Sequence, residues 1–363
     1  MKTTFSILAL SGLMLGAASP ALADANAGLA ELKANNLIVL GNLDSSSEVE
    51  GRTFVGGDLS GSSSNYFILN GKTAPASTAP GLTVVGDVTG GTKNLNNSSG
   101  AAIGGNESSG LNLNGPNQSL TIGGTGHDIN GSSGSTITVG GAVSGNLNAN
   151  GATVLTNQGL AGYQAGLAAQ ASAYATDLGD LSTYLAGLAA TDAVTYPFPN
   201  RIQFKPLASA STLAVFDLSS TAVLNPVGEI DFQTGAFDTI IVNVGGTTAT
   251  LGKNFIGSPG GLGQKVIWNF YEATTINFGA NSFYGSVLAP KADGTIGNFI
   301  EGSAAFHNLV QRGEVHLNGY TGHLDITPPG GGGIVPEPAT WALMIAGFGL
   351  AGAVLRRRRF AVA

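Results

Sequence analysis

Short runs of β-forming residues, each followed by a glycine turn, recur along the first half of this chain. After a first turn at Gly56-Gly57, turns follow at Gly86-Asp87, Gly104-Gly105, Gly123-Gly124 and Gly140-Gly141, at steps of 30, 18, 19 and 17 residues. A repeat near 18 residues with one strand and one tight turn is typical of stacked solenoid coils. The sequence therefore predicts a mainly β fold with a right-handed parallel β-solenoid-like body. A β-sandwich with irregular loops is the alternative.

One segment, residues 158–190, departs from the β pattern. Its larger apolar residues step by three and four, which places them on one helical face: Leu160, Tyr163, Leu167, Ala171, Tyr174, Leu178, Leu181, Leu185 and Leu188. We expect one long helix along the flank of the β-body, inserted into it because β-type runs return after Pro199. A coiled-coil dimer seam is the alternative, but the charges that would set a partner are missing.

The N-terminus has the features of a secretory signal peptide, residues 1–23. Lys2 precedes an apolar stretch, and the segment closes on Ala21 and Ala23, a small-x-small cleavage signature before Asp24. The expected partners are a Sec-type export machinery and signal peptidase.

The C-terminus carries a second targeting signal after a Pro/Gly linker, residues 328–335. Residues 339–355 are uncharged and long enough for a short membrane-spanning helix. The arginines that follow predict a cytoplasmic C-terminus and an exported N-terminus. The signal comprises Pro336, Glu337, Pro338, Trp341, Ala342, Arg356, Arg357, Arg358 and Arg359.

This tail, residues 336–363, resembles the PEP-CTERM protein-sorting signal in its PEPxxWA variant. The resemblance implies recognition by an exosortase, a peptidase of the inner membrane of Gram-negative bacteria. It implies cleavage near the motif and transfer from the inner membrane to the outer surface or matrix, usually in cells that make exopolysaccharide. A simple membrane anchor is the alternative.

The body, residues 24–327, is similar to the choice-of-anchor A domain over about residues 30–325. The similarity rests on residues 36–43, 46–58, 268–270, 283–290 and 313–316, and on Glu301-Gly302. That family is named for carrying different surface anchors, which agrees with a sorting tail. The resemblance implies no catalytic residues.

Composition excludes several classes of function. The chain of 363 residues has no cysteine, which rules out disulfide scaffolds, thiolate zinc sites and iron–sulfur clusters. Its net charge of −7 has the wrong sign for binding nucleic acid.

Residues that could carry chemistry form only weak patterns. His307, His316 and His323 lie near Glu301, Glu314 and Asp325 in sequence, but their spacing matches no compact metal motif, and surface histidines are the favoured interpretation. A polysaccharide-cutting groove would need convergent charges, for which the candidates are Lys265, Glu272, Lys291, Asp293, Glu301 and Arg312.

Three further motifs are incomplete. Residues 123–128 match the start of a calcium-binding nonapeptide, but Asn130 stands where an apolar residue belongs. Residues 260–265 lack the spacing of a phosphate loop. The threonine pairs Thr136/Thr138 and Thr248/Thr250 are reminiscent of flat ice-binding faces, but there are only two.

The sequence thus predicts an exported, non-enzymatic envelope protein without a cofactor. Its expected role is adhesion or association with an exopolysaccharide or biofilm matrix. A polysaccharide-active β-helix enzyme and an ice-binding protein are the alternatives.

Overall fold

Short parallel strands stack into a solenoid-like body in the computed structural model, which describes residues 20–207 and 212–326. The first coil shows the plan: β1 (Leu37–Val39), β2 (Leu43–Ser45) and β3 (Glu48–Val49) follow one another, and each belongs to a different face. The mainly β, parallel solenoid-like prediction is confirmed, and the sandwich alternative is wrong.

The first face, which we call the helix-covered face, is the longest run of paired strands. Its first half consists of β1, β4 (Thr53–Val55), β7 (Leu82–Val84), β9 (Ala101–Ile103), β11 (Ser119–Ile122), β13 (Thr136–Val139) and β15 (Thr153–Leu155). Its second half consists of β18 (Leu213–Leu218), β20 (Thr239–Val244), β23 (Val266–Asn269) and the first parts of β26 (Ser286–Ile296) and β28 (Ala304–Gln311).

The second face, the double-row face, follows each glycine turn. It consists of β2, β5 (Leu59–Ser60), β21 (Thr248–Thr250), β24 (Thr275–Asn277) and the second parts of β26 and β28. Isolated bridges from Leu59 to Val88 and from Val88 to Glu107 extend it across two more coils.

The third face, the ladder face, closes each coil. It consists of β3, β6 (Ser64–Tyr66), β8 (Lys93–Leu95), β10 (Leu111–Leu113), β12 (Gly126–Asn130), β14 (Val143–Asn148), β25 (Phe283–Tyr284), β27 (Ile300–Glu301) and β29 (Val315–His316). A separate small sheet contains β16 (Thr195–Phe198), β17 (Arg201–Phe204), β19 (Glu229–Phe232) and β22 (Asn254–Ile256). Two short helical turns, η1 (Thr221–Leu224) and α3 (Leu262–Lys265), complete the second half.

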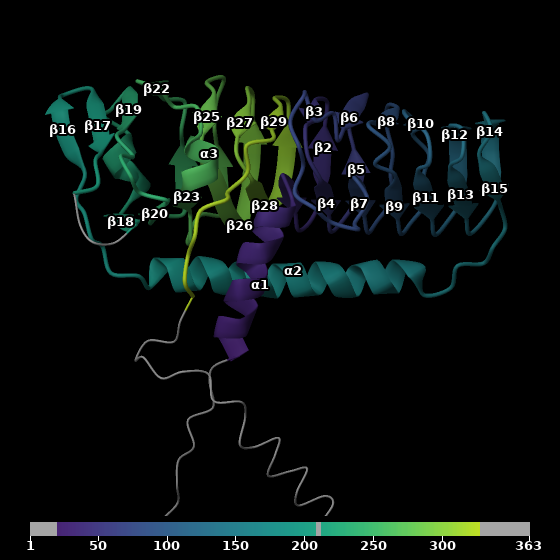
Figure 1. Ribbon diagram of the computed structural model, residues 1–363, viewed down its shortest axis with the longest axis horizontal. Coiled ribbons are helices and arrows are strands. Elements are labelled where there is room, and N and C mark those ends of the chain that lie inside the picture. Colours follow the sequence, from purple (N-terminus) through teal and green to yellow (C-terminus); the bar gives the residue numbers. More distant parts are fainter. Residues whose placement is uncertain (1–19, 208–211, 327–363) are drawn as a thin grey trace, which may run out of the picture. The chain divides into compact units, whose positions relative to one another are not determined.

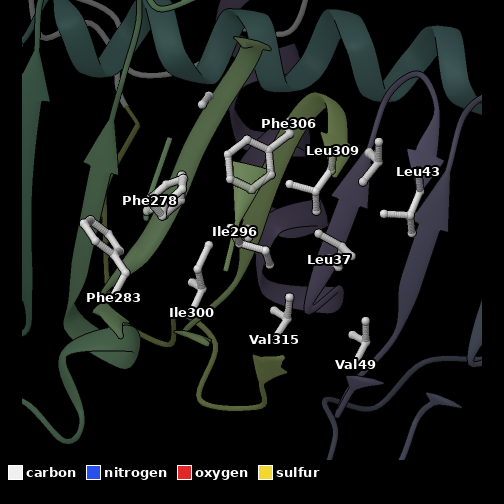
Figure 2. Packing of buried hydrophobic residues seen from close by; sticks show 14 of the residues in the cluster. Leu37, Leu43, Val49, Phe278, Phe283, Ile296, Ile300, Phe306, Leu309 and Val315 are labelled. Carbon is white, nitrogen blue, oxygen red and sulfur yellow. The ribbon is translucent and has the colours of Figure 1, made fainter. Parts of the chain in front are cut away.

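The two halves of the chain join in the middle of the solenoid. Leu37 of β1 pairs with Thr53 of β4 on one side and with Ala304 of β28 on the other. The first coil therefore stacks on the last. Figure 2 shows the interior of this seam, where Leu37 and Leu43 from the start of the chain point into the same core as Ile296 and Leu309.

Helix α2 (Tyr163–Ala186) links the outer end of the first half to the opposite end of the second half. It runs along the helix-covered face for most of the length of the body (Figure 1). It buries Leu178, Leu181 and Leu185, and its Tyr174 ring lies 4.5 Å from the Phe54 ring. The predicted flanking helix within 158–190 is thus present, and its buried leucines belong to the predicted apolar helical face.

Helix α1 (Pro20–Ala34) precedes the first coil and packs on α2. Their backbones approach so closely that a Cβ on Gly28 would lie 2.3 Å from the carbonyl oxygen of Asp177. Lys33 near the end of α1 donates to the carbonyl oxygen of Gly322, 2.8 Å away.

Residues 23–325 form one compact unit. Ala21, Ala23 and Asp24, the predicted signal-cleavage residues, lie within α1. Residues 1–19 of the predicted signal peptide, the linker 328–335, the transmembrane segment 339–355 and the whole sorting motif lie outside the described residues. Over residues 20–207 and 212–326, no helix is long and apolar enough to cross a membrane.

Candidate ligand-binding faces

The double-row face presents two parallel rows of short side chains to solvent. Alternate strand residues point outward, and parallel pairing aligns them from coil to coil. The first row is Thr248, Thr275, Asp293, Asn308, Asn42, Asp58, Asp87, Asn106 and Thr125. The second is Thr250, Asn277, Thr295, Val310, Asp44, Ser60, Thr89 and Ser108. Rows formed in this way are about 6.6 Å apart, with neighbours about 4.8 Å apart along each row.

Backbone hydrogen bonds between the glycine turns hold these coils in register. The amide of Gly86 donates to the carbonyl of Gly57, that of Gly105 to Gly86, and that of Gly124 to Gly105, at 2.9–3.0 Å. A Cβ on Gly123 would lie 2.2 Å from the carbonyl oxygen of Gly104, so only glycine permits this stacking.

The first row is also bonded along part of its length, from Asn308 to Thr125. In each step, the side-chain oxygen of one residue accepts a hydrogen bond from the backbone amide of the next. Asn42 accepts from Asp58 and Asp58 from Asp87, both at 2.8 Å, and Asp87 accepts from Asn106 at 2.6 Å. Because these side chains are fixed to the neighbouring coil, the row is preorganised rather than mobile.

Two carboxylates and one arginine give the middle of this face both negative and positive charges. Arg312 contacts Asp44 at 2.8 Å, and this hydrogen bond holds the pKa of Asp44 below its usual value. Hydrogen bonds from Asn308 and His307 lower the pKa of Asp293 in the same way. Both carboxylates therefore stay ionised at neutral pH.

The ladder face carries a stack of asparagines. Asn112 donates to Asn94, Asn130 to Asn112, and Asn148 to Asn130, over distances of 2.7–2.8 Å. Successive members are 18 residues apart, one coil each. Nearer the seam, Asn65 is in register with Asn94, but its side chain donates to Glu48 at 2.9 Å.

Beyond the seam, the same face carries aromatic rings and carboxylates. The Phe299 ring stacks on His316 at 4.3 Å, and Tyr284 meets Phe299 edge-on at 5.4 Å. His316 also contacts Glu314 through Nε2 at 2.8 Å. A groove of about 340 Å³ lies beside Tyr284, between β22 and the loop that enters β25.

Two other hollows lie elsewhere on the body. One of about 450 Å³ lies between Arg52, the loop of residues 77–81 and Tyr163 of α2. The other, of about 430 Å³, lies near Lys33, Lys72 and Tyr320. Arg52 helps to shape the first hollow because its guanidinium donates to carbonyls of the 75–79 loop.

The three C-terminal histidines have separate partners. His307 contacts Asp293, His316 contacts Glu314, and His323 contacts Asp325. Among the residues that the structure describes, no group of three or more potential ligands could hold a metal ion.

The six charged residues considered for a hydrolase groove also have different neighbours. Lys265 donates to the carbonyl of Phe237, Lys291 to that of Tyr271, and Glu272 accepts from the amide of Gly246. Asp293 contacts His307, Arg312 contacts Asp44, and Glu301 accepts from Asn318.

The other weak motifs are structural where the chain is described. Gly123 and Gly124 belong to the turn stack, Asp128 accepts from the amide of Asn146, and Asn130 belongs to the asparagine stack. Residues 260–261 form a turn that leads into α3, and residues 262–265 are α3 itself.

The two threonine pairs lie on different faces. Thr248 and Thr250 lie in the two outward rows, whereas Thr136 and Thr138 lie on β13 of the helix-covered face.

The outward rows and the asparagine stack are not among the candidate surfaces identified from the sequence. Both left a signal in the sequence: an Asp, Asn or Thr follows nearly every glycine turn, and Asn94, Asn112, Asn130 and Asn148 repeat every 18 residues. The aromatic cluster left no such signal, because Tyr284, Phe299 and His316 come from three different coils.

Comparison with known proteins supplies two family matches. The model of a family described as "Putative Ice-binding-like adhesive domain" matches residues 29–317. The PEP-CTERM protein-sorting motif matches residues 335–359, which confirms that resemblance. The choice-of-anchor A name is not confirmed by these matches. No curated protein matches the chain.

One solved structure with some similarity is described as an ice binding protein from an Antarctic bacterium, Flavobacteriaceae. The identity is 14%, the match covers 86% of this chain and 88% of that one, and the TM-score is 0.27.

Proposed function

The chain belongs to the ice-binding-like adhesive domain family, and we propose that it is an exported surface protein that adheres to hydroxyl-rich polymers of an extracellular matrix. The observation that carries this proposal is the double-row face. It offers aligned hydroxyl, amide and carboxylate groups at one-coil intervals, and its first row is held in place by its own hydrogen bonds from Asn308 to Thr125.

A flat, rigid array of this kind suits an extended ligand with many weak contacts. Each neutral hydrogen bond to a sugar hydroxyl contributes only about 1 kcal/mol. Affinity then comes from many contacts made at once, because the second and later contacts form within one complex. Exopolysaccharide is a ligand of this type.

We also propose the route to the surface. The sorting motif supports processing by an exosortase, after export by a Sec-type machinery and cleavage by signal peptidase. Before processing, the chain would lie with its C-terminus in the cytoplasm and its body outside. Pro336, Glu337, Pro338, Trp341 and Ala342, with Arg356 to Arg359, would form the signal.

We propose no enzymatic role. Several carboxylates near the rows serve as structural acceptors: Asp87 binds the amide of Asn106, and buried Glu107 binds the amides of Gly110 and His127. These carboxylates are engaged in hydrogen bonds that stabilise the fold, and we assign them no role in catalysis.

Ice binding is the second candidate, favoured by one patch. Thr248, Thr250, Thr275 and Thr295 stand together at one end of the two rows. The ionised Asp44 and Asp293 and the Arg312 side chain interrupt the rows further along. Strongly hydrated charges oppose an ordered ice-like water layer, so we rank this candidate second.

The first test is the intact mass and cell fraction of the protein in the bacterium that makes it. We expect a mass that ends near Pro336–Pro338 and a location outside the inner membrane. A chain retained through Ala363 in the inner membrane would overturn the sorting part of the proposal.

The second test is co-sedimentation of the native protein with exopolysaccharide from the same bacterium. Thr89→Lys and Thr295→Lys introduce bulk on the double-row face, and we expect each to weaken binding about tenfold. Thr136→Lys, on the helix-covered face, is the matched control. Unchanged binding in both face variants would overturn the proposed contact surface, and ice-growth inhibition lost in Thr295→Lys would favour the second candidate.

A further inference from the structure

The groove beside Tyr284 has no role in the contact surface proposed above. It lies at the corner between the double-row face and the ladder face, where the loop after β24 turns into β25. Its volume is about 340 Å³, and most of its walls are polar side chains from β22 and from this loop.

The aromatic side of the groove is held rigidly while remaining accessible. Tyr284 lies 5.4 Å from both Phe255 and Phe299, and Phe299 in turn stacks on His316. All four rings are half-buried. Aromatic rings in contact support one another's orientation, so Tyr284 presents a preformed platform that loses little entropy on binding.

The polar side of the groove has open hydrogen-bonding groups. The Asn281 Nδ2 donates to Asn254 Oδ1 at 2.7 Å, which orients both amides. The Asn254 Nδ2, the Asn281 Oδ1 and the Tyr284 hydroxyl make no hydrogen bond within the described part of the chain. Two oriented amide groups and a phenol thus face the groove with donor and acceptor capacity to spare.

The charges around the groove do not favour an ionic ligand. Lys253 is the cation in its lining, and its Nζ already contacts the carbonyl oxygen of Asn225 at 3.3 Å. The carboxylate of Glu301 lies near enough to Tyr284 to add to the rise that burial causes in the tyrosine pKa. A ligand with hydroxyl groups and no net charge fits this balance best.

We propose that this groove binds a short run of neutral hexose rings. The apolar C–H face of one ring would lie against Tyr284, and its hydroxyls would bond Asn254 and Asn281. Aromatic rings attract polarised C–H groups through their electron-rich faces, and amides match the donor–acceptor pairs of sugar hydroxyls. The choice of a saccharide as the ligand rests on the proposed function, whereas the groove and its lining residues are identified from the structure alone.

The test is calorimetric titration of the purified full chain with three soluble probes: cellohexaose, maltohexaose and chitohexaose. We expect at least one to bind, and Tyr284→Ala and Asn281→Ala each to weaken it about tenfold. Tyr284→Phe keeps the ring and should change affinity by less than about threefold. Tyr196→Ala, at an exposed tyrosine of β16, is the matched control and should bind as the wild type does.

The outcomes separate this inference from the proposed function. If none of the three probes binds, or if Tyr284→Ala and Asn281→Ala bind as tightly as the wild type, the groove is not a hexose site. Should Tyr284→Ala melt early, Asn281→Ala decides the question. Polymer binding that Thr89→Lys and Thr295→Lys weaken, together with no binding of the hexose probes, would leave the adhesive face standing and overturn the groove. Hexose binding without polymer binding would support the groove and overturn the double-row face as the adhesive surface.

Discussion

Asn269 and Ser182 exchange two hydrogen bonds where helix α2 meets the helix-covered face. Ser182 Oγ donates to Asn269 Oδ1 at 2.7 Å, and Asn269 Nδ2 donates to the carbonyl oxygen of Ser182 at 2.9 Å. The same Nδ2 donates to Asn243 Oδ1, and Asn243 donates to the carbonyl oxygen of Leu185. All three side chains are buried. This network fixes one end of the helix on the face, and Gln164 near the other end donates to the carbonyl oxygen of Val85 at 3.2 Å.

Asn269→Leu should destabilise the protein by about 2–4 kcal/mol, because it leaves several buried polar groups without partners. Ser182→Ala should cost less, about 1–2 kcal/mol. Urea unfolding followed by circular dichroism measures both. Ser172→Ala on the exposed side of α2 should stay within about 0.5 kcal/mol of the wild type. Equal effects at Ser172 and Ser182 would contradict the assigned role of the network.

Gly123→Ala should destabilise the body by about 2–4 kcal/mol, since the new Cβ would strike the Gly104 carbonyl in the turn stack. Gly166→Ala, on the exposed side of α2 with no atom within 4 Å of its Cβ, should stabilise the chain by about 0.5–1 kcal/mol. Thermal melting compares the two variants. The same sign of effect at both sites would argue against the close-packed turn.

Glu31 makes the packing of α1 on α2 sensitive to pH. Burial raises the pKa of Glu31 to about 8, and the charge of Asp177 adds to the rise. The unfolded chain loses this proton near pH 4.5 while the folded chain keeps it, so the stability contributed here falls as pH rises from about 4.5 to about 8. Glu31→Gln should remove that fall and gain about 1–2 kcal/mol at pH 8.5, after allowance for partial solvent exposure.

Melting curves of the wild type and Glu31→Gln at pH 5 and pH 8.5 measure this effect. The difference between the two proteins isolates Glu31, because carboxylates elsewhere are common to both. A difference that does not grow with pH would refute the assignment.

Lys93 is fully buried inside the solenoid, where its Nζ donates to the carbonyl oxygen of Ser62 at 2.8 Å. Burial lowers the pKa of Lys93 to about 8, although Asp44 and Glu107 oppose the change. Below pH 8 the folded chain bears the full cost of the buried charge, and between about pH 8 and 10.5 it sheds that cost by releasing the proton. Lys93→Met should therefore stabilise the protein by about 1–3 kcal/mol at pH 7.

The gain from Lys93→Met should shrink as pH rises above 8, which chemical unfolding at pH 7 and pH 9.5 can measure. Ser62 is exposed, so water replaces the lost donor. Lys291→Met, at an exposed lysine, is the control and should show no such dependence on pH. A destabilised Lys93→Met at pH 7 would mean that the Ser62 bond outweighs the cost of the buried charge.

Much of the architecture followed from local pattern. The glycine-turn period predicted stacked parallel coils, and the three–four spacing from Leu160 to Leu188 predicted the flanking helix. These features can be predicted from the sequence because each is set by residues that are close along the chain. A tight turn needs glycine once in each coil, and a buried helical face needs apolar residues every three or four positions. The sorting tail could be predicted for the same reason, since its motif, apolar segment and arginines are contiguous.

Only the tertiary structure placed the first coil against the last. Nothing in residues 37–39 indicates pairing with Ala304 rather than with a later neighbour, because a parallel strand edge with small or β-branched inward side chains accepts many partners. That single choice of partner aligns Asn42 with Asn308, joins the two outward rows across the seam, and separates histidines that lie close in sequence. Local sequence patterns thus determined the repeating coil and the sorting signal. The proposed binding surface, the double-row face, depended instead on contacts between residues more than 250 positions apart.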